Sequence, residues 1–91
     1  MNISVTFRNI KTSENIKNYA KKKINRLARY IGNNIDVKVV FSVDKFRRIV
    51  ELSLIIDGYK IYGREESDDM YTAMDMTLDK IKRQIEKYKN R

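Results

Sequence analysis

The 91-residue chain has no cysteine, no histidine, no proline and no tryptophan, and only three glycines. The lack of cysteine excludes disulfide bonds and thiolate metal sites. The lack of histidine removes the commonest metal ligand and the usual general base near neutral pH. The sequence also contains no phosphate-binding loop, no dinucleotide-binding glycine pattern and no nucleophile–base pair. We therefore expect no catalysis, no cofactor, no metal site and no small-molecule substrate.

Long apolar runs are absent as well. Nowhere do about 18 apolar residues follow one another, so no membrane-spanning helix is expected. The first residues alternate between polar and apolar, without the continuous apolar run of a signal peptide. A chain of this length has room for one domain only. We expect one cytoplasmic domain over residues 1–91 that does not associate with a membrane.

The periodicity of the apolar residues changes along the chain. Alternation with polar residues predicts four strands, at residues 2–7, 37–44, 50–56 and 59–64. The last three strands are joined by short turns, at residues 45–48 and at Asp57-Gly58, and should form an antiparallel meander.

Two segments show helical spacing of apolar residues instead. The first helix is expected to be capped by Thr12 or Ser13, to run for about five turns and to end at residues 32–34. The second should be capped by Ser67 or Asp68. Because two amphipathic helices need one shared apolar surface, we predict an α+β fold of order β-α-β-β-β-α. In this fold, two helices pack parallel on one face of a four-stranded sheet.

Positive charge is concentrated in the helical segments. Residues 1–34 contain eight basic residues and one acid, residues 35–66 contain six of each, and residues 80–91 contain six basic residues and one acid. Helical spacing places the basic residues in one row on each helix: Lys22, Arg26 and Arg29, and Lys80, Arg83 and Lys87. Such a row is often only a solvated face, but the first helix lacks the balancing acids of that case. The charge pattern therefore favours binding to a nucleic acid.

Two other groups of residues have a simpler interpretation. The acidic cluster Glu65, Glu66, Asp68 and Asp69 precedes a helix, so helix capping is favoured over metal binding. The six tyrosines are more typical of the edge of a core than of base-stacking platforms.

Three segments carry a resemblance to a known family. They are YAKKKINRLARY at residues 19–30, VVFSVDK at residues 39–45, and ESDDMYTAMD followed by LDKIKRQIEKYK at residues 66–75 and 78–89. Together they closely resemble the ribosome hibernation promoting factors, which include the ribosome-associated inhibitor called protein Y. The resemblance spans essentially the whole chain, and the pattern of its last third is specific.

The resemblance implies a fold arranged like a double-stranded RNA-binding domain. It also implies binding to the small ribosomal subunit and its rRNA, in the channel used by mRNA and tRNA, with inhibition of translation. The rRNA-binding residues that it implies are Lys22, Lys23, Arg26, Arg29, Lys80, Arg83, Lys87 and Lys89. Helical spacing places Lys23 and Lys89 nearer the apolar edge, where a lysine stem that extends along the surface would still bring the amine to solvent.

The domain is expected to be monomeric. It corresponds either to a short form of the family or to the N-terminal domain of a long form. Three alternatives remain: a general double-stranded RNA-binding domain, a protein-interaction module that uses an exposed strand edge, and a basic amphipathic helix on a membrane surface.

Overall fold

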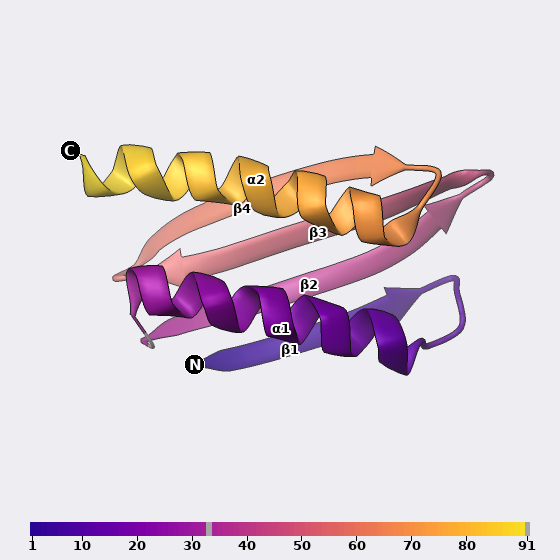
Figure 1. The fold of residues 1–91 in the computed structure, drawn as a ribbon, viewed down its shortest axis with the longest axis horizontal. Helices are drawn as coiled ribbons and strands as arrows, with labels where there is room; N and C mark the ends of the chain where they lie inside the picture. The colour runs from indigo at the N-terminus through magenta and orange to yellow at the C-terminus, as the bar shows by residue number, and fades with distance from the viewer. Residues whose placement is uncertain (33, 91) are drawn as a thin grey trace.

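The computed structural model describes residues 1–32 and 34–90 of the chain. The elements follow the order β1 (Asn2–Arg8), α1 (Glu14–Ile31), β2 (Ile35–Asp44), β3 (Arg47–Ile56), β4 (Tyr59–Ser67) and α2 (Met70–Lys89), as Figure 1 shows. The predicted order β-α-β-β-β-α is thereby confirmed. Asn33, expected in the turn after the first helix, and Arg91 lie outside the described residues.

The four strands form one sheet in the order β1-β2-β3-β4. The strands β2, β3 and β4 pair antiparallel, which confirms the predicted meander. The strand β1 pairs parallel with β2, with Val5 opposite Val39. Because parallel neighbours cannot be joined by a tight turn, the connection between β1 and β2 crosses over through α1.

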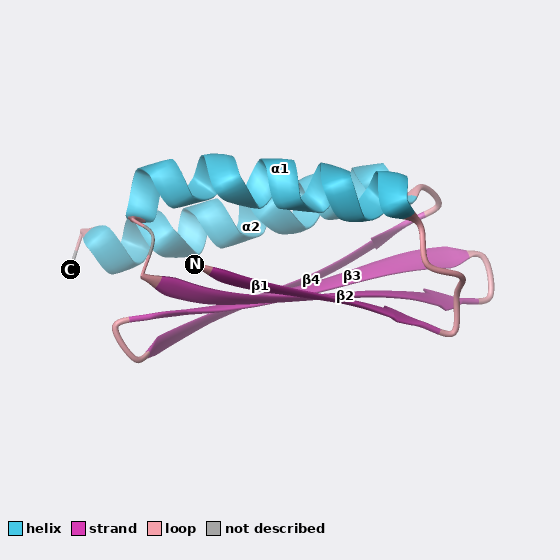
Figure 2. Ribbon diagram, turned by 90° about the horizontal axis from the view of Figure 1, so that it is seen from below, coloured by secondary structure: helices cyan, strands magenta, loops and turns pink. Residues whose placement is uncertain are grey.

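Both helices lie on the same face of this sheet, and the other face is left uncovered (Figure 2). They run in the same direction, so that their N-terminal ends lie at one end of the molecule and their C-terminal ends at the other (Figure 1). The core fills the space between the helices and the sheet, where alternate residues of each strand point toward the helices. The largest fully buried side chains include Phe41, Ile24, Leu52, Leu54, Ile61, Met74, Ile81 and Ile85.

Two turn predictions have different outcomes. Asp57 and Gly58 adopt positive φ angles of 50° and 79°, as expected of the predicted turn between β3 and β4. The reversal predicted over residues 45–48 is wrong in length, since only Lys45 and Phe46 lie between β2 and β3. The ladder continues to the pair Asp44–Arg47, and the Arg47 guanidinium is held by Glu66.

The start of the second helix also differs from the prediction. The strand β4 extends three residues beyond Arg64, and the N-cap of α2 is Asp69 rather than Ser67 or Asp68. The Asp69 carboxylate accepts hydrogen bonds from the backbone N–H and the hydroxyl of Thr72, both at 2.9 Å. Over the described part of the chain, neither helix is long and apolar enough to cross a membrane.

Candidate nucleic-acid interface

Capping and burial fix how α1 presents its basic residues. The Ser13 hydroxyl accepts a hydrogen bond from the Ile16 N–H at 3.2 Å, and Gly32, with a φ of 94°, ends the helix. The buried stripe of α1 consists of Ala20, Ile24, Leu27 and Ala28. Since this stripe faces the sheet, the predicted basic row of α1 is left exposed to solvent on the outer side: Lys22, Arg26 and Arg29.

The helix α2 presents its predicted row differently. All three residues of the row, Lys80, Arg83 and Lys87, are exposed. The Lys80 amine lies 3.8 Å from a carboxylate oxygen of Glu65 on β4. Helical spacing puts Lys87 on the same side, which faces the β4 edge and not α1, with Arg83 nearer the outer surface. The structure therefore does not bring Lys80 together with the cations of α1.

The side of α2 that faces α1 is identified by contacts along the whole seam. Near the helix starts, the Tyr19 hydroxyl donates a 2.6 Å hydrogen bond to Asp75, and the Tyr19 ring meets Tyr71 edge-on with centroids 4.9 Å apart. Near the helix ends, the Lys89 amine donates a 2.8 Å hydrogen bond to the Tyr30 carbonyl. These contacts lock the two helices in parallel alignment.

The Tyr19 contact also has an electrostatic consequence. The hydrogen bond to Asp75, together with burial and the charge of that carboxylate, raises the pKa of Tyr19 from 10.0 to about 12. On the uncovered face of the sheet, a 2.8 Å hydrogen bond to Glu51 raises the pKa of Tyr62 in the same way. Both hydroxyls therefore stay protonated, and able to donate, to a higher pH than an ordinary tyrosine.

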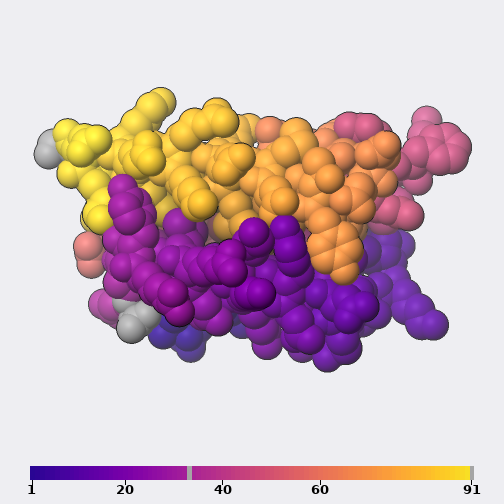
Figure 3. Space-filling model, in the orientation of Figure 1, coloured from indigo at the N-terminus to yellow at the C-terminus, as the bar shows by residue number. Residues whose placement is uncertain are grey.

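Between the contacts at its two ends, the seam opens into a groove of 360 Å³. Figure 3 shows this side of the molecule, where α1 and α2 meet along the middle of the surface. The groove is lined by Lys23, Arg26, Leu27 and Tyr30 of α1 and by Leu78, Lys82 and Glu86 of α2. It thus combines an apolar floor with three cations and a single acid, and we call it the interhelical groove.

The amines of Lys23 and Lys89 both lie close to tyrosine rings of α1. The Lys23 amine lies 5.3 Å from the centre of the Tyr19 ring, and the Lys89 amine lies 4.0 Å from the centre of the Tyr30 ring. Each amine therefore lies over a tyrosine ring at the helix seam, within the range of a cation–π interaction.

The cations of α1 have little competition from protein carboxylates. Within the described residues, the ion pairs are Arg47–Glu66, Arg64–Glu66 and Lys80–Glu65, and none of them involves α1. A charged group without a protein partner remains available to a phosphate. The positive charge of α1 and of the groove is therefore free to attract a polyanion.

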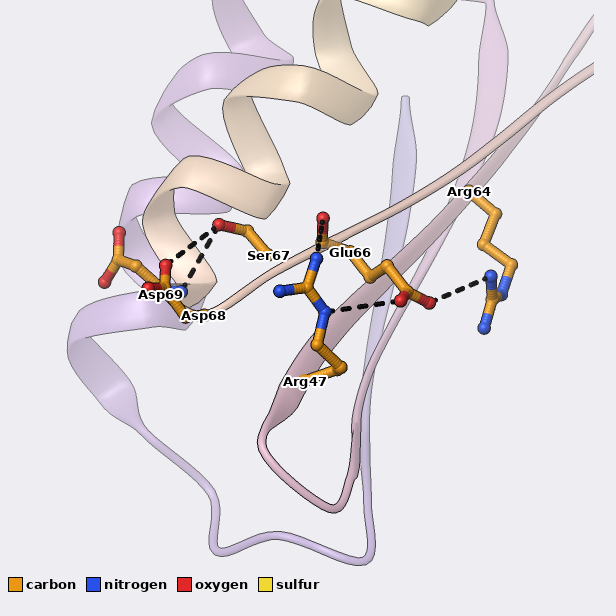
Figure 4. A network of polar contacts seen from close by, with 6 residues as sticks. All are labelled: Arg47, Arg64, Glu66, Ser67, Asp68 and Asp69. Atoms are coloured by element: carbon orange, nitrogen blue, oxygen red, sulfur yellow. Dashed lines mark hydrogen bonds and ion pairs between the residues drawn. The ribbon is translucent and has the colours of Figure 1, made fainter.

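The acidic cluster before α2 has structural partners, as Figure 4 shows for most of its members. Glu66 bridges Arg47 and Arg64, Asp69 caps the helix, and Asp68 accepts a 3.3 Å hydrogen bond from the Ser67 hydroxyl. In the described chain, no group of three acidic side chains is placed to hold a metal ion.

Two features of the groove escape prediction from the sequence. Lys82 belongs to neither predicted basic row, yet it lines the groove beside the cations of α1. Tyr30 fits the apolar spacing of α1, yet half of its surface is exposed, and it forms a wall of the groove. Both positions depend on which side of α2 meets α1, which the helical spacing of one helix does not reveal.

Comparisons with known proteins give a consistent result. The family described as Sigma 54 modulation protein / S30EA ribosomal protein matches residues 3–91. The chain is 29% identical over 91 residues to a ribosome hibernation promoting factor of Azotobacter vinelandii, covering 100% of this chain and 85% of that protein. It is 30% identical to one of Escherichia coli, covering 100% of this chain and 96% of that protein.

Solved structures share the fold closely. A ribosomal subunit interface protein from Coxiella burnetii superposes with a TM-score of 0.89 at 28% identity, covering 100% of both chains. The N-terminal domain of Thermus thermophilus Protein Y superposes with a TM-score of 0.88 at 30% identity, covering 97% of this chain and 99% of that one.

Proposed function

Because the chain belongs to the Sigma 54 modulation protein / S30EA ribosomal protein family, we propose that it binds the small ribosomal subunit in the mRNA and tRNA channel and thereby blocks translation. The family consists of ribosome hibernation factors that are not enzymes. The observation that carries the proposal is the interhelical groove, where Lys23 and Arg26 of α1 converge with Lys82 of α2.

Phosphate groups of rRNA are the ligands that this surface fits. Lysine and arginine side chains contact phosphates without reading base sequence. We propose that the contacts are made by Lys22, Lys23, Arg26, Arg29, Arg83, Lys87 and Lys89, and that Lys82 joins them from the groove. Lys80 lies beside Glu65 on the side of α2 away from the groove, and we propose that it contributes least of the predicted residues. Selectivity for the ribosome would then come from the shape of a folded RNA pocket rather than from a base sequence.

The shape of the domain suits a steric mechanism. Its principal-axis extents are 39 × 20 × 19 Å, and its helices are pinned to one another at both ends of the seam. An elongated, rigid body can occupy a channel at little cost in conformational entropy. Occupying the channel would exclude mRNA and tRNA without any chemical step. We further propose that residues 1–91 act as one monomeric ribosome-binding domain in the cytoplasm.

Co-sedimentation with purified small ribosomal subunits over a series of salt concentrations tests this function. Bulk transfer RNA and duplex RNA serve as competitors. We expect tight binding that weakens steeply as salt rises, because counterions are released at each phosphate contact, and that resists both competitors. Displacement by any RNA would indicate a general double-stranded RNA-binding domain instead. Binding that does not depend on salt would indicate a protein-interaction module.

A further inference from the structure

The turn between β2 and β3 carries an aromatic side chain that contributes little to the core. Phe46 is 88% exposed, the highest value for a large hydrophobic side chain in residues 1–32 and 34–90. The other two phenylalanines, Phe7 and Phe41, stack on each other at 5.1 Å within or against the core. Packing of the core therefore does not explain why an aromatic residue occupies position 46.

The backbone geometry of this turn does not require Lys45 or Phe46. Lys45 adopts a positive φ of 56°, a conformation that glycine or asparagine adopts at lower cost. The chain instead places KFRR at residues 45–48, an aromatic ring among three cations. The tight turn fixes the ring at the apex of the hairpin.

The base of the hairpin is tied to the neighbouring strand β4. The Arg47 guanidinium contacts Glu66 twice, through a side-chain oxygen and the backbone carbonyl, both at 3.3 Å. Arg64 holds the other carboxylate oxygen of Glu66 at 3.4 Å (Figure 4). These contacts join β3 to β4 just below the turn, which restricts movement of the hairpin base before any partner binds.

The hairpin also projects from the body of the molecule. It extends beyond the N-terminal ends of both helices (Figure 1) and stands out at the right of the space-filling view (Figure 3). The interhelical groove is lined by residues from the C-terminal half of α1 and the middle of α2. The hairpin tip is thus a separate contact point, toward the other end of a domain 39 Å long.

We propose that Phe46 stacks on an unpaired nucleobase of ribosomal RNA while the flanking cations contact its phosphates. A solvated aromatic ring beside lysine and arginine is the combination that binds unpaired nucleotides, because every base offers a face for stacking. An apolar protein pocket would also accept the ring, but it gives no role to Lys45 and Arg48, for which the structure shows no ion-pair partner among the described residues. The proposal rests on the ribosome binding proposed above.

A substitution series at position 46 tests the need for a ring face. Affinity for small ribosomal subunits is measured by co-sedimentation for the wild type and for F46A, F46L and F46W. Stacking is worth a loss of about 5-fold to 150-fold on truncation, so F46A and F46L should both lose affinity while F46W keeps it. Ile55→Thr, at an exposed apolar residue of β3, is the matched control and should leave affinity unchanged.

Three outcomes would overturn the proposal. If the wild type does not sediment with subunits, the proposed function fails and this inference fails with it. If the wild type binds and F46A binds equally well, only the stacking contact is refuted. If F46L binds as well as the wild type while F46A does not, the ring occupies an apolar protein pocket.

Photo-crosslinking identifies the partner directly. Phe46→p-benzoylphenylalanine places a photoreactive group at the hairpin tip, and the complex with small subunits is irradiated and then separated into RNA and protein. We expect the crosslink in the rRNA fraction. Crosslinks confined to ribosomal proteins would overturn the proposal. Because Phe46 has so little buried surface, thermal unfolding of each variant should match that of the wild type.

Discussion

Replacing Lys82 by alanine should weaken ribosome binding more than the same replacement of Lys80, two residues earlier in α2. Both substitutions remove one positive charge from the same helix and make the same change in helix propensity. In the structure, the two lysines lie on opposite sides of α2. Lys82 lines the interhelical groove with Lys23 and Arg26, whereas the Lys80 amine lies 3.8 Å from Glu65 on the far side of α2.

The expected magnitude follows from counterion release. Each phosphate contact contributes about 0.7 to 0.9 to the slope of log affinity against log salt. Between 1 M and 0.1 M salt this amounts to about 5-fold to 8-fold in affinity per contact. K82A should lose about that factor at 0.1 M salt. K80A should lose about twofold or less, because Lys80 lies beside Glu65 on the side of α2 away from the groove, where it makes no groove contact.

The assay is co-sedimentation with small ribosomal subunits at several salt concentrations. K82A should lower the slope by about 0.7 to 0.9, and K80A should leave it close to that of the wild type. A loss of affinity in K80A equal to or larger than that in K82A would refute the reasoning. So would a K82A slope indistinguishable from the wild-type slope.

Three further predictions concern the fold. The pKa of Tyr19 is raised from 10.0 to about 12. The stability that its hydrogen bond to Asp75 contributes should therefore be present below pH 10 and lost between pH 10 and about 12. Urea unfolding across this window should show a decrease in the free energy of unfolding that Tyr19→Phe does not show. Asp69→Ala should cost about 1 kcal/mol of unfolding free energy, while Asp69→Asn, which can still accept from Thr72, should cost less. Ile81 is fully buried, so Ile81→Ala should cost about 2–5 kcal/mol in chemical denaturation, and a cost below 1 kcal/mol would contradict the packing described.

Much of the fold could be predicted because local signals agree with the tertiary structure. The apolar stripe of α1, the Ser13 cap and Gly32 define that helix with little ambiguity. The errors occur where long-range pairing decides. Arg47 belongs to β3 because it pairs with Asp44 and binds Glu66, and neither partner is visible from the turn sequence alone.

The site was only partly predictable for a similar reason. Spacing on one helix shows which residues avoid the core, and on that basis Arg26 was correctly expected to be exposed. The spacing along one helix does not show which side of α2 meets α1. That side is set by contacts between the helices, such as Tyr19 with Asp75 and Lys89 with Tyr30. The position of Lys82 in the groove follows from these contacts.

The central claim is that the basic helix face, rather than overall positive charge, binds the ribosome. The most direct test compares two charge-reversal variants with identical net charge, R26E/R83E on the helix face and K38E/K60E on the uncovered face of the sheet, where both lysines are exposed. Affinity for small ribosomal subunits is measured at physiological salt. We expect R26E/R83E to abolish binding and K38E/K60E to retain most of it. Equal losses in the two variants, or retention by R26E/R83E, would contradict the account.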